Sequence, residues 1–137
     1  MKIQAYYLSI NTKQTIMTTQ EVANRYYELI KQNKRAEIQE ELYGKDIVNR
    51  EPEHAATMGI PIVTIGLDAV KAKGKARMEM IETVHNDYCS EPVVGGNFFS
   101  VAFGRDITLK GKPRMKLEEI AVFGVKDGKI VSEQFFY

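Results

Sequence analysis

Glu119 has the setting in this sequence that most clearly suggests chemistry. From residue 115 to residue 125, every second side chain falls on one face of a predicted strand. Glu119 is the one carboxylate on that face, and burial among apolar groups raises the pKa of a carboxylate. Enzymes use such a group as a general acid or as a hydrogen-bond donor. The apolar residues that share the face are Met115, Leu117, Ala121, Phe123 and Val125.

Two alternatives for Glu119 stay open. It can be a structural carboxylate that is hydrogen-bonded to a neighbouring tyrosine. The two faces of the strand can also be exchanged, and Glu118 then takes its place. With Glu119 facing inward, Met115 and Phe123 are candidate ligand-binding residues on the same wall.

A polar stripe on another predicted strand supplies a second candidate set. By alternation, His85 shares a face with Thr83, Asp87 and Cys89. If this face lines a pocket, His85 and Asp87 are ligand-binding residues, and Asp87 can orient His85 as a general base. If it does not, the stripe is the solvent or dimer face of the sheet.

Metal and cofactor chemistry have little support in the sequence. The two histidines show no clustered spacing, so no metal site is expected. Cys89 is the single cysteine, which excludes an internal disulfide. Gly95 and Gly96 lack the strand and helix context of a phosphate-binding loop. We therefore expect a protein that works without a cofactor.

Length and composition predict one domain with a real core. The chain has 137 residues, of which 44% are hydrophobic, and its formal net charge is +1. This charge gives no reason to expect binding to nucleic acid or to an anionic membrane. The apolar runs are too short to cross a bilayer, and the first residues lack the features of a signal peptide. We expect a cytoplasmic protein.

Helical periodicity comes first and strand periodicity follows, which predicts the α+β class. Thr18 and Glu21 form a capping box that opens an amphipathic helix of about four turns. A shorter helix contains Ile38 and Leu42 and ends at Gly44. The predicted domain covers residues 17–137, and residues 1–16 form an N-terminal extension that is either an added strand or a tail.

The middle of the chain is expected to hold a short strand over residues 46–51 and a long loop over residues 52–66 that borders a cavity. A third helix follows, with an apolar side made of Leu67, Val70, Met78 and Ile81. Its basic residues are interpreted as a solvated face. They are Lys71, Lys73, Lys75 and Arg77.

Everything after about residue 82 is predicted to be sheet. The Asp127-Gly128 pair between two apolar segments is a strong signal for a tight hairpin. The predicted strands cover residues 84–89, 97–109, 114–125 and 129–136.

The order of three helices and a long antiparallel sheet resembles that of NTF2-like domains, in particular the SnoaL-like branch. Residues 22–27 (VANRYY) resemble the opening helix, residues 66–70 (GLDAV) the entry to the third helix, and residues 123–131 (FGVKDGKIV) the final hairpin. The resemblance covers about residues 18–137. It implies an NTF2-like (cystatin-like) cone, with three N-terminal helices packed on a strongly bent antiparallel sheet around a pocket. Because family members commonly pair through the outer sheet face, it also implies a homodimer.

The resemblance assigns roles to two further residues. Ketosteroid isomerases of this superfamily use an aspartate before a proline as the base, and Glu51-Pro52 is similar in position. Arg25-Tyr26 resembles the place where their tyrosine donates to the developing oxyanion. Glu51 is then the base, with Tyr26 and protonated Glu119 as donors. The open alternatives are a solvated Glu51 and a Tyr26 that is a core aromatic.

The expected function is a cofactor-independent isomerase, cyclase or dehydratase that moves protons on a small apolar carbonyl compound. Two alternatives stay open. One is a module that binds a small apolar ligand without chemistry, and the other is a dimeric protein-interaction domain. The fold alone does not decide among them.

Overall fold

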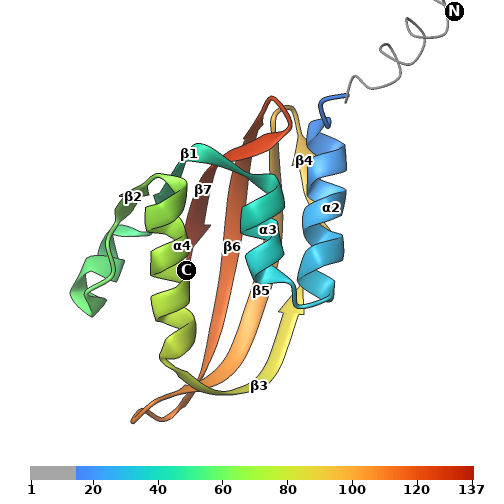
Figure 1. Cartoon of the computed structure of the whole chain (residues 1–137). Helices are drawn as coiled ribbons and strands as arrows, with labels where there is room; N and C mark the ends of the chain where they lie inside the picture. The colour runs from blue at the N-terminus through green and yellow to red at the C-terminus, as the bar shows by residue number, and fades with distance from the viewer. Residues whose placement is uncertain (1–14) are drawn as a thin grey trace, which may run out of the picture.

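The computed structural model of the chain describes residues 15–137, and the predicted extension lies almost entirely outside that range. Within it, three α-helices lie across one face of a curved sheet (Figure 1). They are α2 (Thr19–Lys31), α3 (Arg35–Leu42) and α4 (Leu67–Glu79). None of the described helices is long and apolar enough to cross a membrane. The predicted α+β class is confirmed.

The first helix begins where the capping box predicts. The Thr18 hydroxyl accepts from the Glu21 amide at 3.2 Å, and the Thr18 amide donates to the Glu21 carboxylate at 3.1 Å. Two otherwise unpaired donors at the helix start are therefore satisfied. The predicted apolar stripes of the first two helices are confirmed by the buried residues Val22, Ala23, Tyr26, Leu29, Ile38 and Leu42.

Over residues 15–137 the sheet has seven strands in the order β2-β1-β7-β6-β5-β3, with β4 paired to β5. Among the described strands every pair is antiparallel, as predicted, except β1 with β7, which is parallel. No hairpin joins β1 to β7, so their relative direction leaves no local signal in the sequence. The strands are β1 (Tyr43–Arg50), β2 (Val63–Ile65), β3 (Ile81–Cys89), β4 (Val93–Gly95), β5 (Phe98–Leu109), β6 (Arg114–Lys126) and β7 (Lys129–Phe136).

Three local predictions need correction. Gly44 does not end α3, because the chain leaves the helix at Leu42 and Gly44 already lies in β1. Residues 52–66 are not one loop, since they contain a 3-10 helix (Glu53–Met58) and strand β2. Ile81 starts β3 and does not belong to α4.

An aromatic cluster forms the core between α2 and the β5–β6 pair. The rings of Phe99 and Phe123 stack with centroids 4.8 Å apart, and Tyr26 lies 4.8 Å from Phe123. All three are buried. This cluster holds α2 on the inner face of the sheet, and α4 covers another part of that face, where it contacts β1, β2 and β3 (Figure 1).

Candidate functional site

Glu119 lies on the inner face of β6, as the sequence predicts. The β5–β6 register pairs it with Phe103, next to the pairs Val101–Ala121 and Phe99–Phe123. Burial raises the pKa of the Glu119 carboxyl, the positive charge of Arg77 lowers it, and the negative charge of Glu51 raises it again. Within residues 15–137, the structure gives no hydrogen bond or ion pair to this carboxylate.

Glu51 directly follows β1 and is buried, and both of its carboxylate oxygens have partners. One oxygen accepts from the Lys73 ammonium at 2.8 Å, with an Arg77 nitrogen 3.9 Å away. The other oxygen accepts from the Tyr137 hydroxyl at 3.0 Å. The Glu51 side chain is only 1% exposed, which excludes the solvated strand-end alternative.

Glu133 is a third interior carboxylate, and the sequence analysis did not single it out. It accepts from the Tyr43 hydroxyl at 2.5 Å and from the Asn49 amide at 2.9 Å. Burial raises its pKa, and these two hydrogen bonds oppose the shift. Lys73 donates to Asn49 at 2.5 Å, so the groups around Glu133 and Glu51 form one connected network.

A period-two pattern could have revealed Glu133. On β7 it lies two positions before Phe135, and the register pairs it with Phe123 and pairs Phe135 with Ala121 on the inner face of β6. A carboxylate two positions from an inward-facing aromatic residue is a weaker form of the signal that identified Glu119.

The basic residues of α4 do not all face solvent, which corrects the predicted solvated face. Lys73 and Arg77 are one helical turn apart and follow the buried Val70, so they point at the inner face of the sheet. Lys71 pairs with Glu40 at the surface, and the Lys75 side chain is 80% exposed. The spacing of Val70, Lys73 and Arg77 is the signal that was missed.

Asp87 lies on the inner face, opposite Arg105 in the β3–β5 pair. One Asp87 oxygen is 3.1 Å from an Arg35 nitrogen and 3.6 Å from the Arg105 Nε. Asp87 therefore joins α3 to β5. Cys89 follows on the same face opposite Phe103, and burial raises the pKa of its thiol to about 11.

His85 does not share this face, and the predicted alternation is wrong here. The register shifts between Val84 and Asn86, which adds one residue to β3. The His85 ring instead meets the Thr108 hydroxyl at 2.8 Å on the outer face. Asp87 therefore cannot orient His85 as a general base.

Three further candidates have different surroundings. Tyr26 is a core aromatic whose hydroxyl makes no hydrogen bond to the described residues, and burial raises its pKa well above the ordinary value. Phe123 is 1% exposed and belongs to the core. Met115 lies opposite Ile107 at the far end of the β6 wall and is 38% exposed. Of the two predicted apolar ligand-binding residues, Met115 is exposed to solvent and Phe123 is not.

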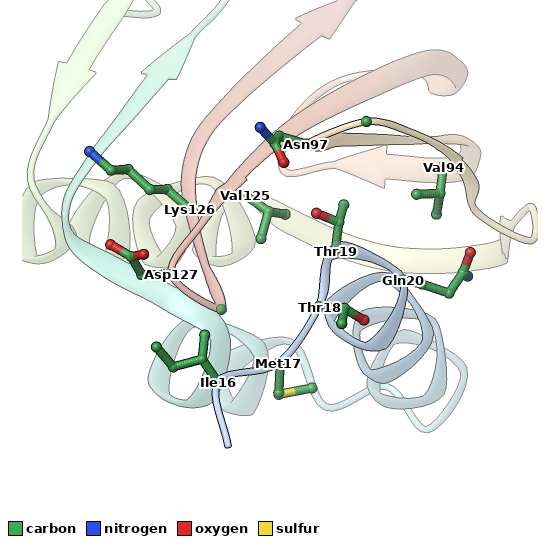
Figure 2. Close-up of a pocket in the computed structure, with 12 residues that line it drawn as sticks. Ile16, Met17, Thr18, Thr19, Gln20, Val94, Asn97, Val125, Lys126 and Asp127 are labelled. Atoms are coloured by element: carbon green, nitrogen blue, oxygen red, sulfur yellow. The ribbon is translucent and has the colours of Figure 1, made fainter. Parts of the chain in front are cut away.

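A groove on the surface lies away from these carboxylates. It has a volume of about 640 Å³ and lies between the start of α2 and the β6–β7 turn (Figure 2). Lys126 and Asp127 of that turn line the groove together with Ile16 and Met17, and the Lys126 side chain extends away from these two residues (Figure 2). Its lining contains no residue predicted to carry chemistry. Within residues 15–137, no group of three His, Cys, Asp or Glu side chains could hold a metal ion.

The family model of the SnoaL-like domain matches residues 17–137. A solved structure assigned as a SnoaL-like polyketide cyclase from Mesorhizobium loti is 33% identical and covers 88% of this chain and 100% of its own, with a TM-score of 0.81. The comparison with curated proteins gave no match.

Two more distant structures share the fold. An NTF2-like protein of unknown function from Burkholderia pseudomallei is 17% identical, covers 88% of this chain and 92% of its own, and has a TM-score of 0.71. TerC, co-crystallised with polyporic acid, is 15% identical, covers 87% of this chain and 90% of its own, and has a TM-score of 0.69.

Proposed function

We propose, from the premise that the chain belongs to the SnoaL-like family and has the NTF2-like fold, that it is an enzyme moving protons on a small carbonyl compound. Isomerisation, cyclisation and dehydration all require such a step. The family and the fold do not define a reaction, so the proposal depends on the side chains of the inner face.

The observation that carries the proposal is the state of Glu119. Its carboxyl has a raised pKa, faces the inside of the sheet, and is bound by no fixed partner among the described residues. A carboxyl with these properties exchanges protons more effectively near neutral pH than an ordinary one. Glu119 is therefore the group best suited to take and return a proton.

In the proposed step, ionised Glu119 takes a proton from the carbon next to the substrate carbonyl. The C–H electron pair becomes the enolate double bond, and the carbonyl oxygen takes the negative charge. Tyr26, whose raised pKa keeps its proton in place, is the proposed donor to that oxygen. Protonated Glu119 then returns the proton to carbon, or gives it to a departing hydroxyl in a dehydration.

The resemblance to the isomerases implies that Glu51 is the base, but it has a different role in the proposed step. A base needs a free oxygen, and both Glu51 oxygens already accept from Lys73 and Tyr137. We propose that Glu51 positions Lys73 and Tyr137 and thereby fixes the shape of the wall around Glu119.

Proton exchange in deuterated water tests the proposal without knowledge of the natural substrate. The probes are phenylacetone and phenylpyruvate, whose exchange at the carbon beside the carbonyl is followed by NMR. Glu119→Gln should lower the enzyme-dependent rate by about 100-fold or more. Glu118→Gln is the matched control, since Glu118 lies next in the strand on the outer face and is exposed. Equal rates in the wild type and in a folded Glu119→Gln would contradict the proposal.

One observation favours the alternative of a binding module without chemistry. Glu51 and Glu133 are both held by fixed side-chain partners, as expected of carboxylates that serve structure. In that case Glu119→Gln changes the affinity for a ligand and leaves no exchange activity to lose.

The homodimer stays a prediction. The outer face exposes Phe98, Ile120 and Phe136, and the last two are paired on neighbouring strands. These residues form the apolar surface through which two copies would meet.

A further inference from the structure

Three arginines gather on the part of the inner face that adjoins Glu119. Arg105 lies on β5, two pairs along from the Phe103–Glu119 pair and on the same face of the sheet. Arg35 reaches in from α3 to Asp87, and Arg77 reaches in from α4 to Glu51. The positive charges of all three arginines lower the pKa of the Glu119 carboxyl. They are called the arginine cluster below.

The arginine cluster has more hydrogen-bond donors than the structure uses. Arg35 and Arg105 share a single carboxylate partner among the described residues, which is Asp87. The Nε atoms of these two arginines are buried and have no hydrogen-bond partner among the described residues. Each guanidinium carries five N–H groups, and a buried donor without a partner costs free energy. Arg35 and Arg105 therefore keep N–H groups that can donate to a further acceptor.

The charge balance also favours an anion. The four interior cations are Lys73 and the arginine cluster, and the carboxylates paired with them are Glu51 and Asp87. Each of these two carboxylates is shared by two cations, and Glu119 forms no ion pair with any of them within residues 15–137. The Arg77 side chain is 39% exposed and the Arg35 side chain 31%, so both can be reached from outside.

We propose that the arginine cluster is a subsite for the carboxylate of the substrate, which is then a small oxo acid whose reacting carbon lies beside Glu119. The planar guanidinium fork matches the two oxygens of a carboxylate, and such charge-assisted bonds are strong. This inference deepens the proposed function, on which it rests, by naming the class of compound that the same interior takes.

Binding of benzoate to the full chain tests the inference directly, with benzamide as a neutral probe of the same shape. Titrations followed by NMR should move the amide signals of residues 117–121 and of Asp87. Benzamide should bind at least about tenfold more weakly, because it lacks the charge that strengthens hydrogen bonds to arginine. Inorganic phosphate, the other anion that suits guanidinium groups, should bind more weakly than benzoate.

Substitutions of single arginines test whether benzoate binds at the arginine cluster. Arg105→Gln and Arg77→Gln should each weaken benzoate binding about tenfold, the loss of one charge-assisted contact. Arg77 is the safer change for folding because it is the more exposed of the two. The matched control is Arg114→Gln, which removes an arginine from the outer face of the same sheet, where it pairs with Asp106. This control should bind benzoate like the wild type.

Three results would overturn the inference. They are equal affinity for benzoate and benzamide, tighter binding of phosphate than of benzoate, and an Arg114→Gln variant that loses as much affinity as the two interior variants. Failure here is distinct from failure of the proposed function. The loss of phenylacetone exchange in Glu119→Gln tests the proton transfer, and the benzoate titration needs no turnover.

Discussion

The two halves of the inner sheet face are built from opposite kinds of side chain. The aromatic half, beneath α2, consists of Tyr26, Phe99 and Phe123 in mutual contact. The charged half, beneath α4, contains the Glu51–Lys73 pair and Glu119, together with the arginine cluster. Figure 1 shows the two helices at opposite sides of the helical layer, with α3 between them.

This contrast separates stability from chemistry. The aromatic half is packed as a core and has no free polar group apart from the Tyr26 hydroxyl. In the charged half, burial and fixed partners hold charges in place, which is what a preorganised site requires. Substitutions in the aromatic half should therefore lower the stability of the fold. Substitutions in the charged half should change the electrostatics of the site and their pH dependence.

The largest expected effect comes from the aromatic half. Phe123→Ala removes a ring that is 1% exposed and that contacts Tyr26 and Phe99, and it should lower the free energy of unfolding by about 3–5 kcal/mol. Chemical denaturation measures this loss. Val93→Ala is the control, since Val93 is 71% exposed and the change should cost about 0.5 kcal/mol or less. Similar losses in both variants would show that the cluster is not the core.

A smaller effect is expected where Lys73 is removed from the charged half. Lys73→Met leaves the buried Glu51 carboxylate with Tyr137 and a distant Arg77, and should cost about 3 kcal/mol of unfolding free energy. The double variant Glu51→Gln with Lys73→Met should regain part of this loss, because no uncompensated charge remains.

The matched control for this change lies two residues along the same helix. The Lys75 side chain is 80% exposed, so Lys75→Met should leave the unfolding free energy almost unchanged. Equal stability of the Lys73→Met and Lys75→Met variants would show that the interior pair contributes nothing.

The sequence predicts the aromatic half well and part of the charged half. The inner face of β6 follows from alternation because the β5–β6 register runs from Phe98 to Thr108 without a shift. The same rule fails for His85, since the extra residue in β3 depends on how the strand meets β5 and leaves no mark in the local pattern.

The hydrogen-bonded network around Glu133 and Glu51 cannot be predicted from the sequence, because its members are far apart along the chain. Glu133 is 90 residues from Tyr43 and 84 residues from Asn49, and the parallel β1–β7 pair brings them together. Lys73 was assigned to solvent because most helix lysines are solvated, and its partner Glu51 lies 22 residues earlier. Interactions of this kind become visible only once the topology is known.

The smallest expected effect is a change in the pH dependence of stability. Burial raises the pKa of Glu133 in the folded state above its ordinary value of about 4.3. As the pH rises from that value through the folded pKa, the folded state holds more protons than the unfolded state, so Glu133 makes stability fall. Glu133→Gln should therefore reduce this fall when melting temperatures are compared from acidic to neutral pH.

Asp106 supplies a control of opposite sign for the same measurement. Its hydrogen bond to Arg114 lowers the pKa of the carboxyl, so its contribution to stability appears as the pH rises and is lost as the pH falls through the folded pKa. Asp106→Asn should flatten the stability curve on the acidic side, and only weakly, because the pair is on the surface. A Glu133→Gln variant with the wild-type pH profile would mean that burial does not raise the pKa of this carboxyl.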